Sequence, residues 1–237
     1  MMKTQTDTND TPHRPDALFF DSNETMLDLS AMAPAVAVAF GGRDDLMSLW
    51  FATMLQHSLV DTVTCNYHDF GTIGVACMQM VAKGHGVDLN KENAQAAISV
   101  MRTLPAHPDV PLALQKLKAA GFRLYPLTNS ASAFMEAQLK HAGIAHYFDG
   151  RLSVDALNVY KPHPRTYHWA AHQVDVPIED CMLIAAHGWD VAGARLAGMR
   201  AAFVERPGKM LYPLGPPVEI SEPTLDAVAD RLIALPK

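Results

Sequence analysis

The segment that decides the fold is Ala17-Leu18-Phe19-Phe20-Asp21-Ser22-Asn23-Glu24-Thr25-Met26-Leu27-Asp28. Its first four residues are apolar and precede a polar turn, a pattern typical of a buried strand in a parallel sheet. Asp21 follows directly, at the carboxyl end of the strand, where open α/β sheets place their ligands. A carboxylate there can act as a nucleophile and form a covalent ester. It could equally be a strand-end residue that caps the next turn, so its role depends on the rest of the chain.

Composition narrows the protein class. The chain has 237 residues, a formal net charge of −6 and three cysteines. This length can bury a substantial core, in one large domain or two smaller ones. The acidic balance and the scattered basic residues argue against binding to nucleic acid or to an anionic membrane surface. Cysteines so sparse, without the spacing of a metal site, indicate a reducing compartment, and we expect the cytoplasm.

The beginning of the chain has no targeting signal that we recognise. Residues 1–15 are polar and lack the apolar core of a signal peptide, so we expect a loose, disordered tail. No later segment reaches the ~20 uninterrupted apolar residues of a membrane-spanning helix. A soluble protein is therefore expected.

The apolar pattern changes along the chain. After Leu29, apolar residues recur at helical spacing around 46–59 and 73–81, and a further helix is predicted at 90–102. From Val110 onward, predicted helices alternate with strands at 122–127, 148–154, 181–186 and 201–204. Such alternation indicates a mostly parallel sheet with right-handed crossovers. The predicted fold is a doubly wound, Rossmann-like α/β core (16–29 and 107–237), with a helical cap (30–106) inserted after the first strand.

Polar residues gather where the predicted strands and crossovers end. Since the carboxyl ends of parallel strands meet at one edge of the sheet, these side chains should lie together. Each has an ordinary alternative: Thr128-Asn129-Ser130 would also cap a helix, and Lys161 could be a solvated loop lysine. Four such clusters favour a functional site over four unrelated structural roles. The clusters contain Asp21 with Thr25, Thr128 with Asn129, Lys161, and Asp190.

These four clusters resemble the motifs of the haloacid dehalogenase superfamily, and more narrowly those of its type II (S)-2-haloacid dehalogenases. The resemblance covers nearly the whole chain after residue 15, including the helical cap. It implies that Asp21 is the nucleophile, in a hhhhDxxxT context that ends at Thr25. It also matches the family's Ser/Thr-Asn pair, lysine, tyrosine and Trp-Asp pair to Thr128-Asn129, Lys161, Tyr167 and Trp189-Asp190.

Two positions argue against the magnesium-dependent phosphatases of the same superfamily. Those enzymes need a second carboxylate two residues after the nucleophile, and here Asn23 cannot transfer a proton at neutral pH. They also need an acid about four residues before Asp190 to help hold magnesium, where this chain has Ala186. Because Mg²⁺ prefers carboxylate oxygens, we expect a mechanism without a metal or other cofactor.

The resemblance implies hydrolytic dehalogenation of short 2-haloalkanoic acids, with fluoroacetate a candidate substrate. Asp21, kept ionised by Lys161, would displace the halide from the carbon beside the carboxylate and form an ester. Asp190 would orient or activate the water that hydrolyses this ester to a 2-hydroxy acid. The predicted substrate-binding residues are Ser22, Asn23, Thr128, Asn129, Phe51, Phe70, Tyr167, His187 and Trp189.

Three positions depart from the family pattern. Phe51 replaces the arginine that receives the halide, and it is either a weak aromatic substitute for that cation or part of the cap core. His57, Asn66 or Asn129 could receive the halide instead. His187 replaces an asparagine, and it is either structural or able to orient water beside Asp190. Glu24 replaces a glycine, and we expect its side chain to point away from the site.

Two other function classes are compatible with the sequence. The same aspartyl-ester chemistry could act on another leaving group, such as a strained ring amine beside a carboxylate, or on a phosphate ester. Alternatively, the chain could have a binding role on an inherited scaffold, although Asp21, Lys161 and Asp190 are all present. A homodimer is expected from the resemblance alone.

Overall fold

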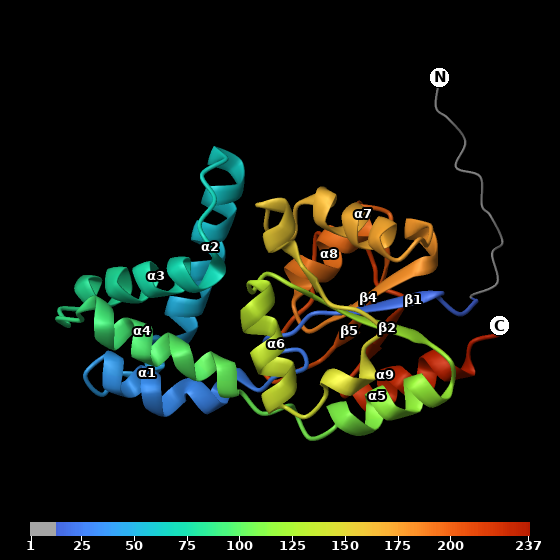
Figure 1. The fold of residues 1–237 in the computed structure, drawn as a ribbon, viewed down its shortest axis with the longest axis horizontal. Helices are drawn as coiled ribbons and strands as arrows, with labels where there is room; N and C mark the ends of the chain where they lie inside the picture. The colour runs from blue at the N-terminus through green and yellow to red at the C-terminus, as the bar shows by residue number, and fades with distance from the viewer. Residues whose placement is uncertain (1–12) are drawn as a thin grey trace.

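The computed structural model describes residues 13–237, and its centre is a six-stranded sheet in the order β3-β2-β1-β4-β5-β6 (Figure 1). All five strand pairings are parallel. The predicted α/β fold is therefore confirmed. The strands are β1 (Ala17–Phe20), β2 (Arg123–Thr128), β3 (Leu152–Ser153), β4 (Cys181–Ala185), β5 (Arg200–Val204) and β6 (Ile220–Glu222).

The first strand lies in the middle of the sheet. Every residue of β1 is buried, and Phe20 pairs with Pro126 on β2 and with Ile184 on β4. The strand order reverses here, because the chain adds β2 and β3 on one side of β1 and β4 to β6 on the other. In open α/β sheets such a reversal leaves a crevice at the carboxyl ends of the strands. Asp21 therefore begins the loop that faces this crevice.

Two pairs of helices cover the two faces of the sheet (Figure 1). One pair is α5 (Val110–Ala119) with α9 (Leu225–Ala234), and the other is α7 (Pro164–Gln173) with α8 (Gly188–Leu196). The apolar residues of α5 recur every three or four positions and are buried, which fixes its orientation on the sheet. A further helix, α6 (Ser132–His141), follows β2.

The remaining helices lie together beside the sheet and its covering helices (Figure 1). They are α1 (Ala33–Ala39), α2 (Met47–Thr64), α3 (Phe70–Gly84) and α4 (Lys91–Ser99). Trp50 on α2 is fully buried, and its indole N–H donates a 2.9 Å hydrogen bond to the Gly74 carbonyl on α3. Because these helices lie together, we propose that residues 30–106 form a cap. It is inserted between the two proposed core segments, 16–29 and 107–237.

The structure differs from the sequence prediction in a few elements. The edge strand β6 was not predicted; it has only three residues and follows a segment rich in proline and glycine. Of the predicted loose tail, residues 1–12 lie outside the described part of the chain. The rest is anchored, since the Arg14 N–H donates to the Pro236 carbonyl and Pro15 is buried. Within residues 13–237, no helix is both long and apolar enough to cross a membrane.

Candidate active site

Lys161 and Thr25 both donate hydrogen bonds to Asp21 at the carboxyl end of β1. Its Oδ1 accepts a hydrogen bond from Lys161 Nζ at 2.9 Å, and its Oδ2 accepts one from Thr25 Oγ1 at 2.7 Å. The Thr25 hydroxyl oxygen in turn accepts the Ala186 N–H at 2.9 Å, so its own proton is directed to Asp21. The Asp21 side chain keeps 8% of its surface exposed. These contacts fix the orientation of the carboxylate and leave it a small accessible face.

Lys161 joins Asp21 to a second carboxylate. Its Nζ also lies 2.6 Å from Asp190 Oδ2, and the Tyr167 hydroxyl donates to Asp190 Oδ1 at 2.6 Å. The loop that carries Lys161 is fixed by Asn129, whose side-chain oxygen accepts the Lys161 backbone N–H at 3.0 Å. The Lys161 ammonium thus joins two carboxylates, Asp21 and Asp190, that come from two separate predicted motifs.

These contacts determine the charge states of Lys161 and Asp21. Burial alone would lower the pKa of Lys161, but the charges of Asp190 and Asp21 outweigh it and raise that pKa. Burial would likewise raise the pKa of Asp21, but the Lys161 charge and the contact with His187 hold it well below its usual range. Asp21 is therefore an ionised carboxylate at neutral pH, as a nucleophile must be.

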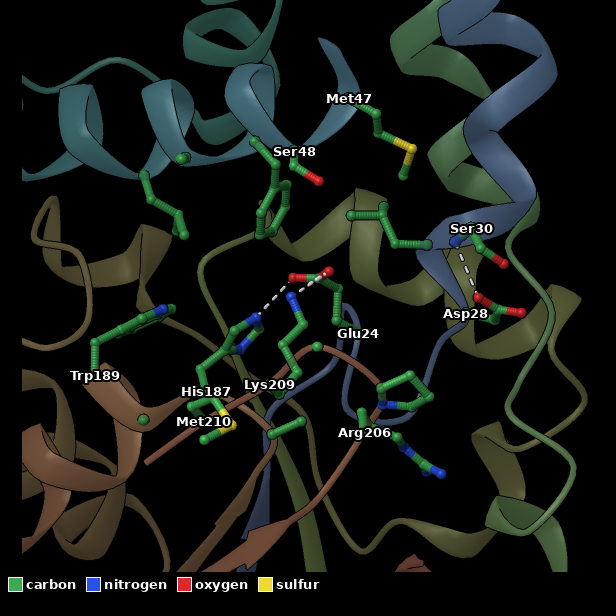
Figure 2. Close-up of a pocket in the computed structure, with 18 of the residues that line it drawn as sticks. Glu24, Asp28, Ser30, Met47, Ser48, His187, Trp189, Arg206, Lys209 and Met210 are labelled. Carbon is green, nitrogen blue, oxygen red and sulfur yellow. Dashed lines mark hydrogen bonds and ion pairs between the residues drawn. The ribbon is translucent and has the colours of Figure 1, made fainter. Parts of the chain in front are cut away.

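His187 lies between two carboxylates. Its Nδ1 is 3.1 Å from Asp21 Oδ2, and its Nε2 is 2.8 Å from Glu24 Oε2. Lys209 Nζ contacts the other Glu24 oxygen at 2.5 Å (Figure 2). Burial lowers the pKa of His187, but the two carboxylates outweigh burial and raise it to about 9. The imidazole is therefore protonated at neutral pH and donates from both nitrogens.

The expectation that Glu24 points away from the site is wrong. Its backbone has φ of 63°, a left-handed conformation that usually favours glycine. From this turn the side chain reaches both His187 and Lys209, and these ion pairs offset the unfavourable backbone conformation. Glu24 is therefore part of the site, although only its replacement of the family's glycine marked it in the sequence.

A large cleft of about 990 Å³ opens beside His187, between α2 and the loop after β5 (Figure 2). Its polar wall includes Glu24, His187 and Lys209. Its apolar wall includes Met47, Phe51, Ala52 and Leu55 of α2, together with Trp189, Met210, Leu211, Tyr212 and Pro213. The described residues that line this cleft do not include Asp21. His187, which contacts both the cleft and Asp21, therefore stands between the two.

Two aromatic rings hold the imidazole of His187. The Phe51 ring stacks on it at 6.2 Å between centroids, and the Trp189 ring stacks at 5.1 Å. Phe70 lies elsewhere, 5.7 Å from the Tyr160 ring and beside a small cavity of about 20 Å³. The structure thus brings two of the three predicted pocket aromatics together.

The remaining predicted residues, Ser22, Asn23 and Thr128, are buried at the carboxyl ends of β1 and β2. The Asn23 side-chain oxygen accepts a 2.9 Å hydrogen bond from Gln138 Nε2, and Thr128 Oγ1 accepts the Ser130 N–H at 3.1 Å. Within residues 13–237, the buried Ser22 Oγ has no hydrogen-bond partner, which leaves it available to a ligand. Gln138 and Lys209 were not predicted from the sequence, because a helical glutamine and a loop lysine belong to no recognisable motif.

None of the three suggested halide receivers, His57, Asn66 and Asn129, lines the cleft. The His57 ring nitrogen Nδ1 contacts the Thr53 carbonyl of its own helix at 2.9 Å, and Asn66 is exposed at the end of α2. Within residues 13–237, no group of three or more His, Cys, Asp or Glu side chains is arranged to hold a metal ion. A reaction without metal stays a prediction, and Asp21 and Asp190 are bridged by Lys161.

Known proteins that are similar to this chain belong to the superfamily that the site geometry indicates. A family model of haloacid dehalogenase-like hydrolases matches residues 15–198. The chain is 28% identical to (S)-2-haloacid dehalogenase 1 of Pseudomonas sp. (strain CBS-3) over 194 residues, 81% of this chain and 86% of that protein. It is 24% identical to haloacetate dehalogenase H-2 of Moraxella sp. (strain B), over 93% of this chain and 98% of the relative.

The solved structure of L-2-haloacid dehalogenase from Xanthobacter autotrophicus superposes with a TM-score of 0.87 at 22% identity. The match covers 93% of this chain and 99% of that one, so the two share their whole fold. The superfamily inferred from Asp21, Lys161 and Asp190 is thereby confirmed. The chain belongs to the haloacid dehalogenase-like hydrolases.

Proposed function

We propose that this chain is a hydrolytic dehalogenase of short 2-haloalkanoic acids, with Asp21 as its nucleophile. The observation that carries the proposal is the ionised Asp21 carboxylate, fixed by Lys161 and Thr25 at the edge of the sheet. The names of the relatives support the carbon–halogen bond as the bond that is broken, because they are (S)-2-haloacid and haloacetate dehalogenases.

In the first step, an Asp21 carboxylate oxygen attacks the carbon beside the substrate carboxylate. A carbon–oxygen bond forms as the carbon–halogen bond breaks, the halide leaves with the electron pair, and the carbon is inverted. Lys161 keeps the nucleophile ionised before the attack. The result is an ester between Asp21 and the substrate.

The substrate carboxylate needs donors close to Asp21. The unpartnered Ser22 Oγ supports this role for the turn after β1, while Thr128 ends the neighbouring strand β2 and Asn129 follows it. Backbone N–H groups at the start of α6 would add to these donors. Phe51 and Trp189 would contact the apolar part of the substrate from the cleft side.

In the second step, water hydrolyses the ester, and the products are a 2-hydroxy acid and restored Asp21. The proposed cap of residues 30–106 would exclude bulk water during the first step and strengthen the polar contacts. The cytoplasmic location and the homodimer expected from the sequence stay predictions.

Halide release tests this function. The substrates are fluoroacetate, chloroacetate and each enantiomer of 2-chloropropionate, all with EDTA present to remove metal ions. We expect wild-type protein to release halide, and Asp21→Asn to release none while keeping its circular dichroism spectrum. Full activity in Asp21→Asn would contradict the nucleophile. Release that requires Mg²⁺ would contradict the metal-free reaction.

A further inference from the structure

The sequence predicts that Asp190 orients or activates the hydrolytic water. Both Asp190 oxygens are already bound, Oδ2 by Lys161 and Oδ1 by Tyr167, and the Asp190 side chain is fully buried. A water that reached it would have to displace one of these donors. His187, by contrast, lines the open cleft and contacts Asp21 directly.

The two ring nitrogens of His187 have different partners. Nδ1 faces Asp21, where an ester would form, while Nε2 faces Glu24 at 2.8 Å. A base whose far nitrogen is oriented by a carboxylate is a recurring arrangement in nucleophilic catalysis. Lys209 fixes the other oxygen of Glu24, and the Phe51 and Trp189 rings limit rotation of the imidazole.

We propose that His187, oriented by Glu24, is the general base for hydrolysis of the Asp21 ester. This inference rests on the proposed function and assigns the residue that completes its second step. His187 is then a catalytic residue, and Glu24 is a positioning residue. Both residues replace others in the family pattern, an asparagine and a glycine, and the fold brings the two replacements into direct contact.

The charges around His187 explain how one residue serves both steps. The ionisable groups that face it are Asp21 and Glu24, with Lys161 and Lys209 bound to these carboxylates, while α2 contributes the uncharged Phe51. Asp28, His107 and Arg206 line the same cleft. In the free protein two carboxylates keep His187 protonated. Ester formation removes the charge of Asp21, so the pKa of His187 falls and its proton leaves through the cleft.

In the second step, His187 takes a proton from water and passes it to the product. Water bonds to the Asp21 carbonyl carbon and gives one proton to Nδ1, while Nε2–H donates to Glu24. The bond from that carbon to the substrate oxygen breaks, and the proton on Nδ1 passes to this oxygen to form the 2-hydroxy acid. Asp21 is left as a carboxylic acid that returns its proton to His187. The net reaction consumes one water and releases the halide and one proton.

The experiment separates ester formation from ester hydrolysis, with 2-chloropropionate as the probe and rapid quenching. In His187→Asn, the amide can still donate to Asp21 but cannot accept a proton. We expect chloride release to stop near one equivalent per site, hydrolysis to fall by about 10²–10⁴-fold, and intact mass spectrometry to detect the ester. The matched control is His172→Asn, an exposed histidine at the end of α7, which should turn over like wild type.

A second variant tests the role through pH. General-base hydrolysis should speed up with rising pH as His187 loses its proton. Glu24→Gln removes one carboxylate partner, so this rise should move to lower pH, which a purely structural role would not produce. Hydrolysis by His187→Asn at the wild-type rate, or an unmoved pH profile in Glu24→Gln, would overturn the assignment while leaving the dehalogenase function intact. No chloride from wild type would instead overturn the proposed function, and this assignment with it.

Discussion

The ammonium of Lys161 lies 2.6 Å from Asp190 Oδ2, and neither side chain has any exposed surface. An ion pair so deeply buried is retained only while each charge has its partner, because an unpaired charge in the interior is unfavourable. Asp21 depends on the same ammonium at 2.9 Å. Lys161 therefore links the stability of the fold to the charge of the proposed nucleophile.

Lys161→Met should be strongly destabilising. The substitution leaves Asp21 and Asp190 buried without their cation, which we expect to lower the free energy of unfolding by about 3–5 kcal/mol. The pKa of Asp21 should also rise, because its opposing charge is gone. Urea unfolding measures the first effect. The control is Lys118→Ala, which breaks a partly exposed pair with Asp149 and should lower stability by less than about 1 kcal/mol.

Thr25→Val tests the hydrogen-bond chain from Ala186 to Asp21. Valine removes the hydroxyl that donates to Asp21 Oδ2 and accepts the Ala186 N–H. An unsatisfied buried N–H is unfavourable by about 1–3 kcal/mol, so the urea midpoint should fall accordingly. Chloride release should also slow, because the carboxylate loses one of its fixed donors. Thr25→Ser keeps the hydroxyl and should recover most of both properties, and equal losses in the two variants would contradict this account.

The free energy of unfolding should fall at alkaline pH, because His187 loses its proton there. Its pKa is raised from 6.5 to about 9 in the folded protein, so the folded state holds the proton more tightly than the unfolded chain. The stabilisation is complete below pH 6.5 and is lost as the pH rises through about 9. Its size is about 3 kcal/mol, taking ~1.4 kcal/mol for each pKa unit. Urea unfolding across this range should show the decline in wild type and a much flatter profile in His187→Asn.

The structure brings together the predicted residues that belong to a motif and also follow an element whose place in the sheet the chain order determines. Asp21, Lys161 and Asp190 follow elements whose order along the chain determines the parallel sheet, so their meeting at its edge follows from the topology. Phe70 was matched by spacing alone, and the structure places its ring against Tyr160 and not in the large cleft.

Glu24 and Lys209 show what the sequence could not determine. A glutamate in a left-handed turn is locally unfavourable, and only the nearby His187 and Lys209 make an inward orientation stable. Lys209 comes from a loop 185 residues away in the chain, so no local pattern predicts the contact. Such compensation between distant residues appears only in the folded structure.

Gly193→Ala tests how tightly the loop that carries Lys161 packs on α8. An added Cβ would lie 2.4 Å from Pro162 Cβ and 2.8 Å from the Tyr167 hydroxyl, closer than such atoms can approach. Pro162 follows Lys161 in the chain, and Tyr167 donates to Asp190, so relief of the clash must displace the groups around the buried ammonium. We expect a loss of about 1–3 kcal/mol in the free energy of unfolding, together with slower chloride release.

The control for Gly193 is Gly84→Ala at the end of α3, where an added Cβ meets nothing within 4 Å. Alanine has less conformational freedom than glycine in the unfolded chain, so this variant should be neutral or more stable by up to about 1 kcal/mol. Both variants add one methyl group to a helix, and only the first adds it against Pro162 and Tyr167. Equal stability and equal chloride release in the two variants would mean that the packing of α8 does not hold Lys161 in place.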